Sequence, residues 1–105
     1  MLEEYVEYIK ERIGYKSDIE VRIRHLKASI AKTSFKDGVI TLDPVIRELE
    51  KDKVLYVLVH EIAHLKSGTL CHTQSFWKEI EKVFPKEMIE NLEKRIIERV
   101  GRIWH

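Results

Sequence analysis

Two histidines and a glutamate in the middle of the chain have residue types and a spacing suited to metal chemistry. The segment His60-Glu61-Ile62-Ala63-His64 is a His-Glu-x-x-His pattern. On an α-helix, residues four apart lie on the same face, so the imidazoles of His60 and His64 can bind one ion. Glu61 is rotated by about 100° from His60, which places its carboxylate beside the ion. The pattern therefore predicts Glu61 as the general base for a metal-bound water.

The residues around this pattern predict that its helix is buried. Val54–Val59, Ile62, Ala63 and Leu65 make the segment apolar around most of its circumference. Two imidazoles and a carboxylate on a buried helix are costly unless they have partners, and a metal ion supplies one. The alternative is a pair of core histidines satisfied by hydrogen bonds, with Glu61 in solvent.

A catalytic zinc usually takes a third protein ligand and leaves one position to water. We expect this ligand to be His72, which follows the helix-ending Ser67-Gly68 and precedes a helix capped by Thr73 or Ser75. Three other residues remain candidates: Cys71, because zinc accepts thiolate, and Glu79 and Glu81, because many zinc peptidases use a later glutamate. His72 itself would otherwise be a solvated loop histidine.

The sequence VLVHEIAHLK followed by CHTQSFW resembles the minigluzincins, which are very small metallopeptidases of the gluzincin type. The resemblance covers about residues 39–84 and extends to the catalytic cores of HtpX-like and prenyl-protein membrane peptidases. It implies one Zn²⁺ per chain on His60, His64 and His72, with Glu61 as general base and acid, and a peptide or protein as substrate. The membrane relatives place an aspartate four residues after the third ligand, where this chain has Phe76.

The pattern of apolar residues predicts an α+β fold in a single domain over residues 1–105, and the resemblance implies that this fold is of zincin type. We expect an N-terminal helix, a short and largely antiparallel three-stranded sheet, a buried active-site helix and C-terminal helices. The expected helices are 2–13, 43–50, 52–67, 73–84 and 86–101, and the expected strands are 19–25, 28–35 and 39–42. Lys36-Asp37-Gly38 is a hairpin signal, and the resemblance implies that residues 28–34 form the substrate-binding rim.

Two further residues are candidates for stabilising the oxyanion of a cleavage reaction. Tyr56 precedes His60 by one helical turn. His25 has the inward parity of the strand that contains Ile19, Val21 and Ile23. His25 could also be a fourth metal ligand, although a hydrogen-bonded core or edge histidine fits its position better.

The last residues form the most unusual segment of the chain. Gly101 ends the last predicted helix, and Trp104, His105 and the terminal carboxylate follow. Because this segment carries an aromatic anchor, an imidazole and the terminal carboxylate, we expect residues 102–105 to lie in the cleft and cap the open coordination position as an autoinhibitory tail. The resemblance supports this expectation, because the minigluzincins are described as zymogens silenced by C-terminal segments. The tail could act within one chain or across a dimer. The alternative is a packed Trp104 and a solvated His105.

Composition limits the remaining function classes. With 105 residues and a net charge of +1, the composition gives no reason to expect nucleic acid or an anionic membrane as a partner. It has no apolar run long enough to span a bilayer and no recognisable signal peptide, so we expect a cytoplasmic protein. One Cys excludes an internal disulfide, and the single Asn and Gln are typical of proteins from hot environments. The alternative to a peptidase is a non-catalytic, zinc-stabilised interaction or regulatory module.

Overall fold

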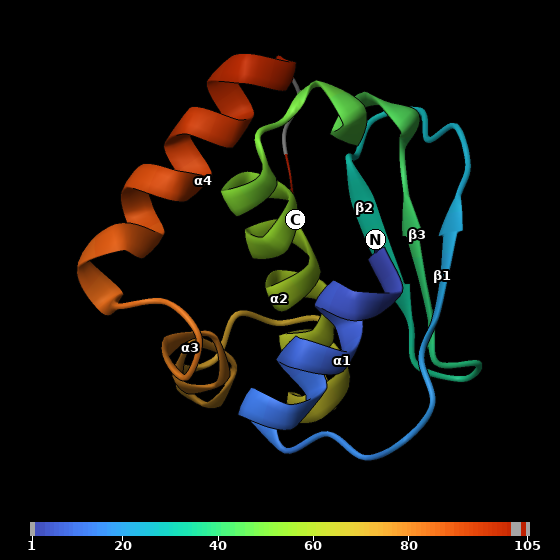
Figure 1. Cartoon of the computed structure of the whole chain (residues 1–105), viewed down its shortest axis with the longest axis vertical. Helices are drawn as coiled ribbons and strands as arrows, with labels where there is room; N and C mark the ends of the chain where they lie inside the picture. The colour runs from blue at the N-terminus through green and yellow to red at the C-terminus, as the bar shows by residue number, and fades with distance from the viewer. Residues whose placement is uncertain (1, 102–103, 105) are drawn as a thin grey trace.

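The computed structural model describes residues 2–101 and Trp104. A three-stranded sheet forms one side of the molecule, and α2 lies between this sheet and α4 (Figure 1). The elements are α1 (Leu2–Ile13), β1 (Glu20–Ile23), β2 (Ala31–Ser34), β3 (Val39–Leu42), the 3₁₀-helix η1 (Pro44–Glu48), α2 (Lys51–Ser67), α3 (Gln74–Glu81) and α4 (Lys86–Val100). The predicted α+β class is confirmed, although β2 and α3 are shorter than expected.

The sheet has the strand order β1-β3-β2, with one pairing of each kind. β2 and β3 form the predicted antiparallel hairpin, whose turn contains Gly38 at φ 64°. β1 pairs with β3 in parallel, so the expectation of a largely antiparallel sheet was wrong for this pair. The chain crosses the end of β3 between β1 and β2. Asp43 holds this crossing, because its Oδ2 accepts a hydrogen bond from the Leu26 amide at 2.7 Å.

Asp43 also begins the helical part of the chain, as its position before Pro44 predicts. Its Oδ1 accepts a hydrogen bond from the Val45 amide at 2.8 Å, which caps η1. The expected helix to residue 50 is a single short 3₁₀-helix instead, and α2 starts at Lys51. Asp43 therefore joins the sheet edge to the entry of the active-site helix.

The helix α2 forms the centre of the hydrophobic core. Every residue from Tyr56 to Leu65 is buried, because β2, α1 and α3 surround this part of the helix. Gly68 ends α2 in the left-handed conformation at φ 73°, and its amide donates to the His64 carbonyl at 2.9 Å. This reversal returns the chain toward the histidine pair.

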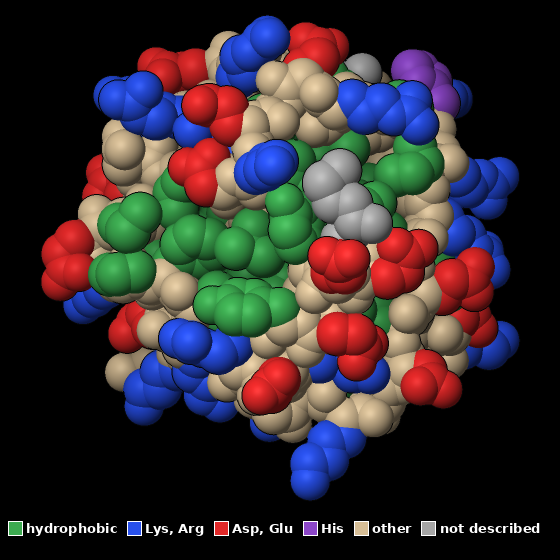
Figure 2. All heavy atoms as spheres, viewed as in Figure 1, with side chains coloured by type: hydrophobic (Ala, Val, Ile, Leu, Met, Phe, Trp, Pro, Cys, Tyr) green, Lys and Arg blue, Asp and Glu red, His purple; other side chains and the backbone are tan. Residues whose placement is uncertain are grey.

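Hydrophobic side chains reach the surface over α2, between α1 and α4, and charged side chains surround this area (Figure 2). Among the described residues, no helix is both long enough and apolar enough to cross a membrane.

Candidate metal centre

The first two histidines of the candidate site come from consecutive turns of α2. His60 and His64 are only 1% and 2% exposed, and their ring centroids lie 5.0 Å apart. The spacing of four residues therefore has the effect that the sequence predicted, with both rings on one buried face.

The third histidine comes from the loop between α2 and α3. The ring of His72 lies 5.0 Å from that of His60 and 5.2 Å from that of His64, between centroids. Each of the three histidines offers a nitrogen, and these nitrogens all lie within 4.8 Å of one another. Thr73 caps α3 by accepting a hydrogen bond from the Phe76 amide at 3.2 Å, which fixes the loop end beside His72. A set of three imidazoles fits the ligand preference of a catalytic zinc.

A main-chain carbonyl orients His64. Its Nδ1 lies 2.9 Å from the Thr69 carbonyl oxygen, which can only accept a hydrogen bond. Nδ1 therefore carries the proton, and Nε2 keeps a lone pair for a metal. Burial lowers the pKa of His64, which favours this neutral form. The role of Thr69 was not predicted, because the chain reversal at Gly68 is its only local signal in the sequence.

An aromatic ring packs behind the histidines. It belongs to Phe76, at the position where the resemblance implies an aspartate in the membrane peptidases. Phe76 is fully buried and stacks on His72, with centroids 4.6 Å apart and planes at 9°. It also stacks on His64 at 4.4 Å and contacts the His60 ring at 5.0 Å. Packing against Phe76 thus adds an apolar restraint on the orientations of all three rings.

The carboxylate of Glu61 has different partners on its two oxygens. Glu61 is 1% exposed, and the hydroxyl of Thr33 on β2 donates to Oε1 at 2.6 Å. On the other side, Oε2 lies 3.1 Å from His60 Nδ1 and accepts a hydrogen bond from Trp104 Nε1 at 3.1 Å. Thr33 was expected in the substrate rim, and no sequence pattern connected it with Glu61.

Trp104 lies inside the site. It is 7% exposed, its ring centroid is 4.1 Å from that of His60, and it meets the Tyr56 ring edge-on at 5.6 Å. The predicted partner in the tail, His105, lies outside the described residues, as do Arg102 and Ile103.

The two candidate oxyanion donors have other partners in this conformation. Tyr56 donates its hydroxyl to Glu93 Oε2 at 2.7 Å, and burial together with Glu93 raises its pKa. The His25 side chain is 81% exposed, with Nδ1 3.6 Å from Asp43 Oδ2. It points outward because β1 ends at Ile23, two residues earlier than the alternation predicted.

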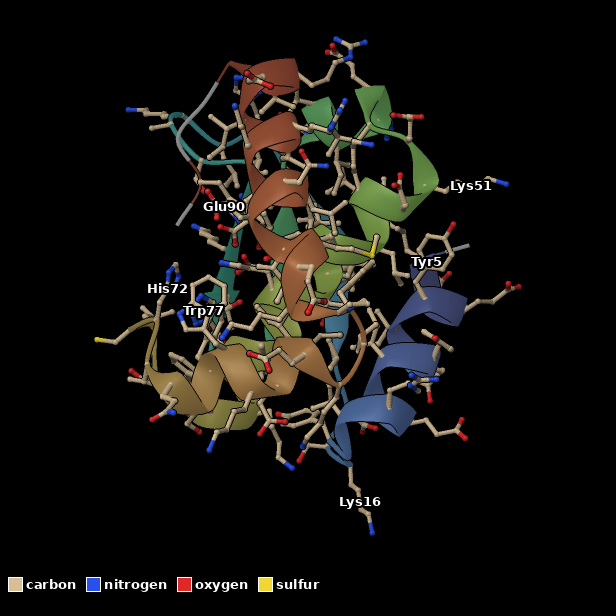
Figure 3. All side chains as sticks on the ribbon, turned by 90° about the vertical axis from the view of Figure 1, so that its left-hand side faces the viewer. Tyr5, Lys16, Lys51, His72, Trp77 and Glu90 are labelled. Carbon is tan, nitrogen blue, oxygen red and sulfur yellow. The ribbon has the colours of Figure 1, made fainter. Side chains whose placement is uncertain are left out.

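The other candidates for the third ligand point elsewhere. Cys71 is exposed as a free thiol, and Glu79 pairs with Lys82 at 2.7 Å. Glu81 lines a hollow of about 730 Å³ between α3 and α4, together with Trp77, Ile89, Glu90 and others. Figure 3 shows Trp77 beside His72, with Glu90 on α4 above them, so this hollow lies next to the histidine cluster.

Residues 1–95 match a known family described as "YgjP-like, metallopeptidase domain". The chain belongs to this family. The match includes all three histidines and Glu61, so this YgjP-like chain carries its buried histidine cluster within the metallopeptidase domain.

Two solved structures resemble the whole fold of this YgjP-like metallopeptidase. One is the metallopeptidase zymogen of Pyrococcus abyssi abylysin, which is 48% identical, covers 100% of both chains and has a TM-score of 0.97. The other is the metallopeptidase zymogen of Methanocaldococcus jannaschii jannalysin, which is 25% identical over 95% of this chain and 97% of that one, with a TM-score of 0.85. An uncharacterised protein of Aquifex aeolicus is 26% identical over 90% of this chain and 86% of its own length. The resemblance to minigluzincin-type metallopeptidases is thus confirmed.

Proposed function

We propose that this YgjP-like metallopeptidase hydrolyses peptide bonds with one zinc ion on His60, His64 and His72, and that it is made in a latent form. The observation that carries the proposal is the convergence of three imidazoles beside the buried carboxylate of Glu61. A zinc ion bound there would lower the pKa of a bound water toward 7 and polarise the scissile carbonyl.

The residues of the chain have separate roles in this proposal. Glu61 accepts a proton from the attacking water and then gives it to the leaving amine. His64 presents Nε2 because its Nδ1 proton is used by Thr69, and Phe76 keeps the rings in place by stacking. The same carboxylate therefore acts first as base and then as acid, without leaving its position beside the histidines.

Latency is supported by the contacts of Trp104 and by the relatives. The indole N–H donates to Glu61 Oε2, which lies on the His60 side and would receive the water proton. The indole ring also packs against His60, so it fills space that a peptide would need. Both similar solved structures are described as metallopeptidase zymogens. We infer that residues 102–105 form the inhibitory tail and that Trp104 acts on its own chain.

The substrate would be an extended peptide bound along β2. This strand is at one edge of the sheet and carries Thr33, which contacts Glu61. A peptide added to that edge would gain main-chain hydrogen bonds, and its side chains would find pockets on either side. The hollow between α3 and α4 is a suitable receptor for a side chain, because it lies beside His72 and combines Trp77 and Ile89 with charged residues.

The alternative is a non-catalytic module that keeps a zinc ion for stability. A structural zinc site closes all four positions and needs no general base. Here a carboxylate is buried beside the three histidines and is held by two hydrogen-bond donors, which favours the enzyme. A cytoplasmic location, an origin in a hot environment, and assembly as a monomer or as a dimer through the C-terminal segment stay predictions.

The proposal is tested with the full chain carrying Trp104→Ala, loaded with one equivalent of Zn²⁺ and incubated with casein and a peptide library. We expect cleavage that depends on zinc and that disappears when Glu61→Gln is added. Metal analysis of each variant is the control, because Glu61→Gln should bind as much zinc as its parent. Cleavage that persists in the Glu61→Gln protein would show that Glu61 is not the general base. Absence of bound metal in every variant would refute the proposal of a zinc-dependent enzyme.

A further inference from the structure

We infer that Thr33 is a positioning residue for the reaction: its hydroxyl anchors Oε1 of Glu61 so that Oε2 alone acts on the water. This inference rests on the proposed function, because it assigns the support of the proposed base. Thr33 is 28 positions from Glu61 in the chain and lies on β2, the edge strand of the sheet that packs beside α2.

The geometry gives the Thr33 hydroxyl one dominant acceptor. Its Oγ1 lies 2.6 Å from Glu61 Oε1 and 3.3 Å from the Glu61 main-chain oxygen. A hydroxyl has a single proton to donate, and an O–H···O⁻ bond of this length to a carboxylate is of the strong, charge-assisted kind. Thr33 is also branched at Cβ within a strand, so its χ1 angle is restricted and the hydroxyl direction is well defined.

The two carboxylate oxygens of Glu61 therefore have unequal surroundings. Oε1 accepts a hydrogen bond from the Thr33 hydroxyl of β2, whereas Oε2 faces His60 Nδ1 and the indole of Trp104. When the tail leaves, Oε2 loses the indole donor and keeps its contact with His60. Glu61 then keeps its orientation through Thr33, with Oε2 free to accept a proton from a water beside the histidines.

This arrangement links the base to the substrate-binding edge. Thr33 lies within β2, and its strand partner in the register is Ile40 of β3, so the opposite edge of β2 has no strand partner among the described residues. The residue that orients the base is thus part of the strand along which we propose that the peptide binds. A shift of β2 would move the peptide and Glu61 together.

The test compares Thr33→Val, which keeps the shape but removes the hydroxyl, with Thr33→Ser, which keeps the hydroxyl. Both are made in the zinc-loaded Trp104→Ala chain. We expect Thr33→Val to lower kcat by about tenfold or more at nearly unchanged KM, because a misdirected general base loses part of its contribution. Thr33→Ser should restore most of kcat.

The matched control is Thr41→Val, which makes the same chemical change on the adjacent strand. Thr41 is 7% exposed and is paired in register with Lys32, so it lies on the other face of the sheet from Thr33. This variant should keep the kcat of its parent. Zinc content should be the same in all of these proteins, since none of the changes touches a histidine.

A second readout does not depend on turnover. In the full-length chain with Trp104 intact and ¹³C-labelled glutamate, the Glu61 carboxyl resonance is assigned by its loss in Glu61→Gln. It should shift in Thr33→Val and stay near its original position in Thr33→Ser and Thr41→Val. If Trp104→Ala shows no activity, the proposed function fails, and this resonance still decides whether Thr33 holds Glu61. The inference is overturned if Thr33→Val leaves the Glu61 carboxyl resonance unshifted. It is also overturned if Thr33→Val leaves kcat unchanged.

Discussion

Trp104 should account for most of the latency of this metallopeptidase, and two substitutions separate its contributions. Trp104→Ala removes the indole of a residue that is only 7% exposed and that packs on His60 and Tyr56. Trp104→Phe keeps an aromatic ring but removes the N–H that donates to Glu61 Oε2.

The expected magnitudes follow from these contacts. Replacing a buried tryptophan with alanine costs about 3–5 kcal/mol, and losing one hydrogen bond to a charged group costs about 1.5–3 kcal/mol. Since about 1.4 kcal/mol is a factor of ten, Trp104→Ala should shift the ratio of closed to open site by about 10² to 4 × 10³. Trp104→Phe should shift it by about 10–10², so its kcat/KM should lie between those of the parent and of Trp104→Ala.

The assay is kcat/KM for a peptide found with the activated protein, measured at equal zinc occupancy. Met88→Ala serves as the control, because Met88 is an exposed apolar residue of α4, the helix that precedes the tail. In a Trp77→Phe background Trp104 is the only indole, so its fluorescence reports burial directly. If Trp104→Ala cleaves no faster than the parent while binding zinc equally, the indole does not control access. If Trp104→Phe equals the parent, the hydrogen bond to Glu61 contributes nothing.

Three further predictions concern the support of the site. His72→Ala should lower zinc affinity by about tenfold or more and reduce the increase in melting temperature on adding zinc. Titration calorimetry of the variant and its parent measures this, and an unchanged affinity would contradict the prediction. Tyr56→Phe should lower the free energy of unfolding by about 1–3 kcal/mol in denaturant titrations, because Glu93 loses a buried donor, and an unchanged midpoint would refute this. Gly68→Ala should cost about 1 kcal/mol, since φ is 73° with open space around the α-carbon; equal stability of the variant would show that the left-handed cap is not needed.

Local signals predicted the parts of the site that depend on short sequence distances. The spacing of His60 and His64 defines one helix face, Gly68 ends that helix, and Thr73 starts the next one, so His72 was expected beside the pair. All of these depend on helix geometry and capping, which are decided by a few neighbouring residues.

Contacts between segments that are far apart in the chain could not be predicted from the sequence. Alternation in residues 19–25 shows which side of a strand is apolar but not which strand it joins, so the parallel β1–β3 pairing was missed. The inward orientation predicted for His25 was wrong for a related reason: strand alternation applies only within a strand, and β1 ends at Ile23. Thr33 and Glu61 are 28 residues apart, and no periodic pattern connects a strand hydroxyl to a helix carboxylate. Trp104 was expected in the cleft from the aromatic and zinc-binding groups of the tail together with the family resemblance, but no pattern indicated its hydrogen bond to Glu61.

If the indole of Trp104 blocks the site as proposed, a peptide must compete with a group of the same polypeptide that is always nearby at high effective concentration. The apparent dissociation constant of any substrate is then the intrinsic value divided by the fraction of molecules with the indole out. Intact protein should consequently resemble an enzyme with a very high KM and an ordinary kcat. A lack of activity at low peptide concentration would then result from Trp104 occupying the site, while the catalytic groups themselves are intact.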